Sequence, residues 1–196
     1  MSTTVPTAAS EVVKPKRTFR RRYSVVRGNA YQVWGLISGS ALLAVAASLD
    51  RNAVATILMI VGLWVVFLNC HAIAHYLAGR LVGLRFRGYG VAGTDHPEVY
   101  PPGIRQLLEA APFYVTLSTK QSREKVGRRA KAFYYAAGET STAIWSIAYA
   151  AIATIANIPG ASILLIAMIV FNLISTIVTT RNPSGDYGRA LRALRS

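Results

Sequence analysis

Four long apolar stretches constrain this chain more than any other feature of its sequence. A helix of about 20 residues rises about 30 Å, the thickness of the hydrocarbon core of a membrane, so stretches of that length can span it. Hydrophobic residues make up 53% of the chain, more than an average soluble domain contains. The sequence therefore predicts an all-α membrane protein with a single polytopic domain over residues 31–196. Its four transmembrane helices are predicted at residues 31–49, 53–79, 132–157 and 161–180.

Lys and Arg residues lie almost entirely at one end of these predicted helices. All of the 22 except Arg51 fall in residues 1–30, in the loop between residues 80 and 131, or after Thr180. Because Lys and Arg concentrate in cytoplasmic loops, we expect both termini and the long loop to be cytoplasmic. This topology explains the net charge of +14, so the expected partner is the lipid bilayer and not nucleic acid. The high alanine and arginine content is typical of a GC-rich bacterial genome and favours the bacterial cell membrane.

The segments outside the apolar stretches carry weaker patterns. Residues 1–30 are basic, and their first part has no apolar pattern, so we expect a flexible cytoplasmic arm. In the long loop, the segment from Leu84 to Val91 alternates apolar and polar residues, which predicts a short strand or hairpin. Such a strand could offer its edge to an extended peptide. Residues 104–111 have one apolar face and predict a short helix at the membrane interface.

Two histidines and one aspartate are the candidate ligands of a metal ion. His71 and His75 are four residues apart on a predicted helix, so both side chains emerge from one face. Counted from Ala53 at about 1.5 Å per residue, His71 lies about 27 Å along the helix and therefore near the cytoplasmic face. Asp186 follows the last predicted helix and reaches the same face, and Gly185 beside it permits a tight turn.

Two imidazoles and one carboxylate with an open fourth position form a catalytic zinc arrangement. Other interpretations stay open, because paired histidines in an apolar helix also form hydrogen bonds between helices. Asp186 could equally cap a helix that starts after it. A metal transporter is a weaker interpretation, since the three ligands cluster at one face and no second site marks a path across the bilayer.

The residues around these ligands resemble the site-2 protease family of intramembrane zinc metalloproteases. The segment from Asn69 to His75 is similar to the zinc motif HExxH of that family. Residues 137–142 fall where the family has a helix with Ala-Gly-Pro, and residues 171–173 and 182–189 resemble its Asn-Leu and Asp-Gly signature. The resemblance covers approximately residues 53–194.

Several expectations follow from this resemblance. It implies a three-helix metalloprotease core in which one zinc ion per chain is bound by His71, His75 and Asp186. The implied reaction is hydrolysis of a peptide bond in or near a transmembrane segment of a membrane protein substrate. Asn172 and Asn182 are implied to support the ligands or to contact the substrate, although a hydrogen bond between helices also explains Asn172.

Position 72 departs from the family pattern. The family's general base is the glutamate directly after the first histidine, and this chain has Ala72 there. A zinc-bound water has its pKa lowered toward about 7, but a positioned carboxylate must still move its proton, typically a contribution of about 10² to 10⁴-fold. The chain as written is therefore expected to be catalytically inactive. Two explanations remain open: a glutamate replaced to obtain an inactive enzyme, which we favour, and a natural pseudoprotease that binds a transmembrane partner without cleaving it.

Glu139 is the other acidic residue of interest. It lies about 10 Å into the third predicted helix, at a depth that overlaps that of His71 and His75. A carboxylate inside a membrane is costly and needs a partner or a wet cavity. Three roles are open to it: a displaced general base, a hydrogen-bond acceptor that orients a histidine, or a buried group that stabilises helix packing.

Overall fold

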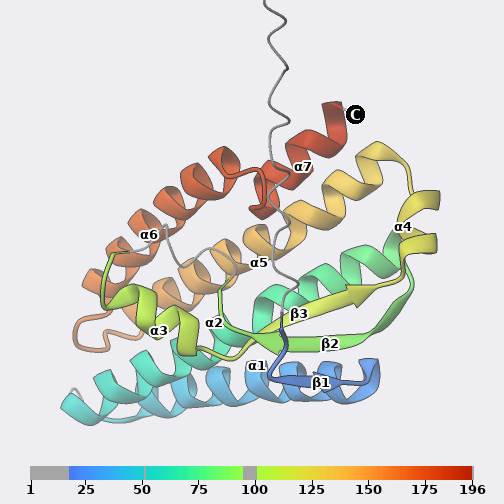
Figure 1. Cartoon of the computed structure of the whole chain (residues 1–196). Coiled ribbons are helices and arrows are strands. Elements are labelled where there is room, and N and C mark those ends of the chain that lie inside the picture. Colours follow the sequence, from blue (N-terminus) through green and yellow to red (C-terminus); the bar gives the residue numbers. More distant parts are fainter. Residues whose placement is uncertain (1–17, 51, 95–100, 196) are drawn as a thin grey trace, which may run out of the picture.

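Two long helical hairpins and a small sheet make up the computed structural model, which describes residues 18–50, 52–94 and 101–195 (Figure 1). The long helices are α1 (Val25–Ser48), α2 (Ala53–Leu81), α5 (Arg128–Ile155) and α6 (Ala161–Arg181). The short helices are α3 (Ile104–Ala110), α4 (Lys120–Lys125) and α7 (Asp186–Arg195). The strands are β1 (Arg21–Tyr23), β2 (Phe86–Ala92) and β3 (Phe113–Ser118).

Three of the long helices, α1, α2 and α6, are long and apolar enough to cross a membrane. The structure therefore confirms the membrane class as far as helix length and composition can. Helix α5 has 28 residues, which is sufficient length, but its first half is polar and contains Glu139 and Thr140. Because of this polarity α5 does not meet the same criterion, and the fourth transmembrane helix stays a prediction.

The turns at the helix ends explain where the hairpins begin. Asn52 caps α2, because its side-chain Oδ1 accepts a hydrogen bond of 3.0 Å from the Ala55 amide. Ser24 caps α1 in the same way through the Arg27 amide. Helix α1 therefore starts at Val25 and not at residue 31, and the arm predicted over residues 1–30 is shorter than expected. Of that arm, residues 1–17 lie outside the described residues.

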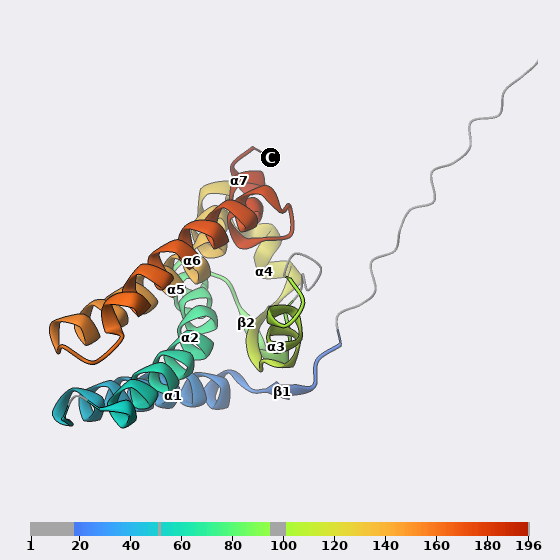
Figure 2. The same ribbon diagram turned by 90° about the vertical axis from the view of Figure 1, so that its left-hand side faces the viewer.

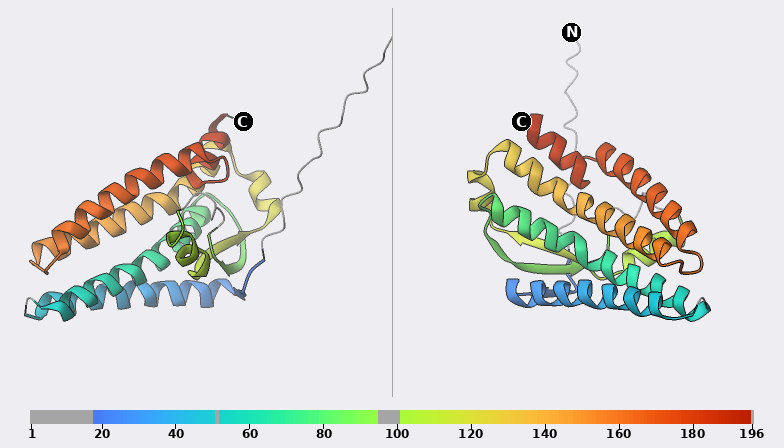
Figure 3. Two further views of the ribbon diagram at one scale, coloured as in Figure 1. Left: turned by 60° about the vertical axis from the view of Figure 1, so that its left-hand side comes forward. Right: turned by 180° about the vertical axis from the view of Figure 1, so that it is seen from behind.

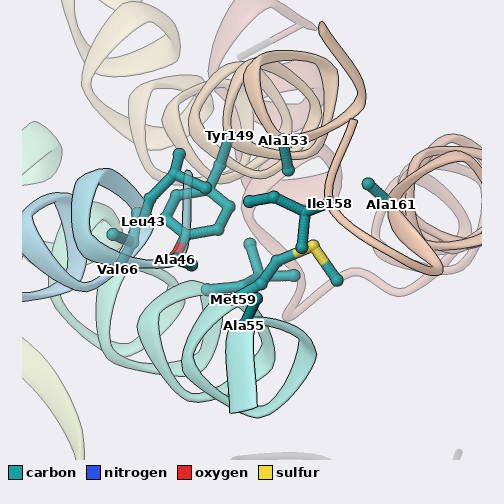
Figure 4. Close-up of a cluster of buried hydrophobic side chains, with 10 residues drawn as sticks. Leu43, Ala46, Ala55, Met59, Val66, Tyr149, Ala153, Ile158 and Ala161 are labelled. Atoms are coloured by element: carbon teal, nitrogen blue, oxygen red, sulfur yellow. The ribbon is translucent and has the colours of Figure 1, made fainter. Parts of the chain in front are cut away.

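The two hairpins are held together at the end where each makes its turn (Figures 2 and 3). Glycines allow a close approach of α1 and α2, since a β-carbon on Gly39 would lie 2.7 Å from the Gly62 carbonyl oxygen. Tyr149 of α5 donates a hydrogen bond of 3.3 Å to the Gly39 carbonyl. A buried cluster surrounds this contact and joins α1, α2, α5 and the α5–α6 turn (Figure 4): Leu43, Ala46, Ala55, Met59, Leu63, Val66, Tyr149, Ala153, Ile158 and Ala161.

A three-stranded antiparallel sheet in the order β1-β2-β3 lies at the opposite end of the hairpins, beside α3 and α4, while α7 packs against α5 and α6 at the same end (Figures 1 and 2). Tyr23 of β1 pairs with Tyr89 of β2, and Tyr89 pairs with Thr116 of β3. The strand predicted between Leu84 and Val91 is confirmed as β2. The structure is mostly helical, as predicted, and its β element is a sheet that also includes β1 and β3, which come from segments predicted as arm and loop.

Candidate metal centre

The three predicted ligands meet at the sheet end of the structure. Helix α2 presents His71 and His75 from one face, and α7 begins with Asp186. The Asp186 Oδ2 atom lies 3.1 Å from Nε2 of His71 and 2.9 Å from Nε2 of His75. One donor atom from each residue lies within 4.8 Å of the other two. The structure therefore confirms that these residues form one possible metal site.

The spacing of the donor atoms fits a single metal ion. Two ligand atoms on a tetrahedral zinc ion, each about 2.0 to 2.1 Å from it, lie roughly 3.3 Å apart. The Asp186 oxygen lies 2.9 and 3.1 Å from the two histidine nitrogens, and all three donor atoms lie within 4.8 Å of one another, so modest side-chain movements would bring them to that spacing. The His71 side chain is 33% exposed, so a further ligand can approach the site from outside. The residues present therefore fit a three-ligand site with an open position.

The hydrogen bonds that Nδ1 of each histidine makes determine its tautomer, and therefore whether Nε2, which faces Asp186, carries a lone pair. The Tyr134 carbonyl, 2.7 Å from Nδ1 of His75, can only accept, so Nδ1 of His75 donates. The Thr142 hydroxyl donates to the Gly138 carbonyl at 3.1 Å, which leaves its oxygen to accept from Nδ1 of His71, also at 3.1 Å. Both Nε2 atoms therefore present lone pairs to the Asp186 carboxylate.

The two histidine Nε2 atoms and the Asp186 carboxylate are all acceptors when the rings are neutral, so positive charge must lie between them. Two further protons, one on each ring, would create two adjacent cations beside a single carboxylate, whereas one divalent ion satisfies all three groups at once. Burial alone would raise the pKa of the Asp186 carboxyl, but when the two histidines are protonated and donate to it, their charge outweighs that effect and holds the pKa below its usual range. Asp186 is therefore ionised near neutral pH, as a metal ligand must be.

Asn182 and two glycines position the Asp186 carboxylate. The Asn182 side chain accepts a hydrogen bond of 2.9 Å from the Ser184 amide, and its carbonyl accepts one of 2.9 Å from the Gly185 amide. A β-carbon on Gly185 would lie 2.5 Å from the Thr179 carbonyl oxygen, and one on Gly188 would overlap the Asn182 carbonyl. The chain can therefore turn tightly from α6 into α7 only with glycine at these positions. Asn182 builds this turn and supports Asp186 indirectly.

Helix α5 lies directly against the ligands at Gly138. A β-carbon at this position would overlap Nε2 of His75 and would lie 2.7 Å from Nε2 of His71. Only glycine leaves room there for both imidazoles and anything bound between them. The segment 137–142, noted in the sequence for its resemblance to a family motif, thus contributes both this space and the Thr142 hydroxyl.

The remaining predicted site residues have different surroundings. Glu139 lines the same cleft as the ligands, and its hydrogen-bond partner among the described residues is Ser175, whose hydroxyl donates to Oε2 at 3.3 Å. Asn172 is buried and donates hydrogen bonds of 2.9 Å to Ser146 of α5 and 2.7 Å to the Met168 carbonyl, so it links α5 and α6. Ala72 is 1% exposed and does not line the cleft.

The ligands lie in a cleft of about 980 Å³, here called the metal cleft. Phe67 and Leu68 of α2, Phe171 and Ser175 of α6, and residues 114–118 of β3 form its walls. Over the described residues β3 pairs with β2 alone, so its second edge is open. Strand β2 lies between β1 and β3. The prediction that the segment from Leu84 to Val91 offers a free edge is therefore wrong at residues 89–91, where β2 pairs with β1.

Two supporting residues, Thr142 and Tyr134, were missed in the sequence analysis. Tyr134 acts through its backbone carbonyl, which leaves no sequence signal. Thr142 had a usable signal, because it lies four residues after Gly138 on the same face of a predicted helix.

Comparisons of the chain with models of known protein families, with curated proteins and with solved structures find no match. The observations that bear on function are therefore those of the structure itself. They are the meeting of three donor groups, the hydrogen bonds that orient them and the cleft that leads to them.

Proposed function

We propose that this chain is an intramembrane zinc metalloprotease of the site-2 protease type, inactivated by Ala72 in place of the general-base glutamate, whose metal cleft holds an extended segment of a transmembrane protein substrate. The observation that carries this proposal is the convergence of two imidazole lone pairs and an ionised carboxylate on one point. Two nitrogen donors and one oxygen donor suit zinc. Zinc bound there would supply Lewis acidity and a water activated for attack on a peptide carbonyl.

Each residue near the centre then has a defined task. His71, His75 and Asp186 would bind the ion, and the Thr142 hydroxyl and the Tyr134 carbonyl hold the two imidazoles in the required orientation. The Asn172 hydrogen bond to Ser146 joins α6 to α5 away from the ligands. The apolar walls at Phe67 and Phe171 suit the side chains of a transmembrane segment.

The open edge of β3 supports binding of an unwound substrate. A peptide bond inside a helix is protected by its hydrogen bonds, so a transmembrane segment must become extended before it is cut. An extended chain can add to a free strand edge through main-chain hydrogen bonds. Residues 114–118 of β3 line the same cleft as the metal ligands, so a chain bound along that edge would pass the centre.

We further propose that α5 is a fourth transmembrane helix and that the sheet end is cytoplasmic. Large apolar side chains on α5 point outward, while Gly138, Thr142 and Ser146 are buried against the neighbouring helices. The exposed apolar set on α5 comprises Phe133, Ile144, Trp145, Ile152 and Ile155. An apolar outer face with a polar inner face is the arrangement that lipid favours. The Lys and Arg distribution supports cytoplasmic termini, in a multi-pass protein that we assign to the bacterial cell membrane.

A natural pseudoprotease is the second candidate, and the surroundings of position 72 favour it. The Ala72 side chain is buried and lies outside the cleft lining, so a glutamate at this position would have to displace packed neighbours to reach the centre. In this case the chain would bind zinc and hold a transmembrane partner without cleaving it. Both candidates share the metal site and the cleft.

An Ala72→Glu variant distinguishes the two candidates. The variant and the unaltered chain are purified, their zinc contents are compared, and each is incubated with single-pass membrane segments. Cleavage by Ala72→Glu that disappears when Asp186→Asn is added would support the protease. A folded, zinc-loaded Ala72→Glu protein that binds the segments and leaves them intact would instead support the pseudoprotease. Absence of zinc from every variant would contradict both.

A further inference from the structure

Four arginines from four different elements line the metal cleft. They are Arg22 of β1, Arg87 of β2, Arg123 of α4 and Arg189 of α7. These residues are far apart in the sequence, so folding brings them together and no local basic run accounts for them. Within the part of the chain that the structure describes, the acidic residues that line the same cleft are Glu139 and Asp186. The cleft is therefore positively charged, and a bound divalent metal ion would make it more so.

Among the described residues, most of this charge has no acidic partner. Over residues 18–50, 52–94 and 101–195, no carboxylate lies within ion-pair distance of Arg22, Arg87 or Arg123. Arg22 lies over the Phe19 ring at 5.6 Å, a contact that leaves its charge available. Arg189 is 4.0 Å from Oδ1 of Asp186, whose other oxygen faces the histidines. Unpaired cations that share one cleft repel one another, which favours an anionic occupant.

The usual charge pattern of membrane proteins indicates which segments the arginine-lined cleft would attract or repel. Transmembrane segments usually have Lys and Arg on their cytoplasmic side. A cleft lined by arginines at that side repels such a flank and attracts one that carries Asp or Glu. A binding site can discriminate in this way both by attraction to one partner and by repulsion of the commoner ones.

We propose that the metal cleft selects transmembrane segments with an acidic cytoplasmic flank and rejects those with a basic flank. This inference rests on the proposed function, because it requires the cleft to hold a transmembrane segment. Anionic lipid headgroups are the other anionic candidates. The peptide is favoured because these arginines share the cleft with the metal ligands and the open β3 edge. Basic residues outside the cleft lining, such as Arg128, Arg129 and Lys131, remain available for headgroups.

The test uses the full chain in bilayer discs of neutral phosphatidylcholine. Three synthetic segments share one transmembrane sequence and differ in the cytoplasmic flank, which is acidic, neutral or basic. We expect the acidic segment to bind about tenfold more tightly than the neutral one, as several partly exposed charge pairs would give. The basic segment should bind most weakly, and added salt should reduce the differences.

Paired variants connect the preference to the arginines. Arg87→Gln with Arg123→Gln should remove most of the preference for the acidic flank, since both side chains are exposed and their loss leaves the fold intact. Arg128→Gln with Arg129→Gln removes the same charge outside the cleft and should leave the preference unchanged. Equal loss in both pairs would overturn the inference.

The outcomes separate this inference from the proposed function. Equal binding of all three segments would overturn the inference and leave the proposed function in place. Failure of all three to bind would overturn the proposed function and the inference with it. If the segments bind equally and Arg87→Gln with Arg123→Gln only weakens association with anionic lipid, the surface binds headgroups and the inference is wrong.

Discussion

Replacing Gly138 by alanine places a methyl group where the two histidine ligand atoms lie. The new β-carbon would overlap Nε2 of His75 and would lie 2.7 Å from Nε2 of His71. An ordinary carbon–nitrogen contact is about 3.4 Å, so His71 alone must move by about 0.7 Å, and His75 must move farther. Metal sites require their ligands within about 0.5 Å of the productive position. We therefore expect Gly138→Ala to weaken zinc binding by about 100-fold or more.

The same substitution should not weaken the helix. Alanine is favoured over glycine in a helix interior by about 0.8 to 1.0 kcal/mol, so a loss of zinc cannot be attributed to a failure of α5 to form. Gly127→Ala is the matched control, because a β-carbon at Gly127 meets nothing within 4 Å. Zinc affinity is measured by competition with a chelator, and folding by thermal unfolding in detergent. A Gly138→Ala protein that binds zinc as tightly as the unaltered chain would refute the reasoning.

Three further results are expected. Thr142→Val removes the acceptor for Nδ1 of His71 while keeping the side-chain shape, and a chelator competition should show zinc affinity reduced about 10 to 100-fold. Asn172→Ala removes the hydrogen bond to Ser146, so unfolding in detergent should show a loss of about 0.6 to 1.7 kcal/mol with zinc content unchanged; a loss of zinc instead would show that Asn172 supports the ligands directly. When the pH is lowered from 7 to about 4, Asp186 should stay ionised, so no zinc should be released through protonation of this residue. The pKa of Asp186 is held below its ordinary value of 3.8, so its ionised form and the stability it contributes persist above that value and are lost only at lower pH. Zinc release between pH 7 and about pH 4, at a pH where both histidine ligands are still neutral, would contradict this.

The candidate ligands His71 and His75 could be predicted from the sequence because their signal is local. A spacing of four residues places His71 and His75 on one face of any helix, and the length of the preceding apolar stretch sets their depth. Asp186 required one more step, since it follows the last apolar helix and must lie at the same end. That step depends on the number of crossings, predicted as four from the apolar stretches; helix length and composition support three of them, α1, α2 and α6.

The sheet could not be predicted to the same extent because its pairing is non-local. Strand β1 has three residues, too few for an alternating pattern, and it pairs with β2 across more than 60 positions of the chain. Strand β3 has β-branched and aromatic residues but is bounded by short helices, which hides it within an irregular loop. Which strand is central and which has an open edge depends on tertiary structure, so the edge was assigned to the wrong strand.

Metal content is the measurement that tests the account most directly. The full chain and a His75→Ala variant are purified, loaded with zinc, freed of loosely bound metal and analysed for their elements. The account predicts about one zinc per chain in the unaltered protein and its loss in the variant, because two remaining ligands hold zinc weakly. Zinc absent from both proteins, or present equally in both, would contradict the claim that His71, His75 and Asp186 form a metal centre.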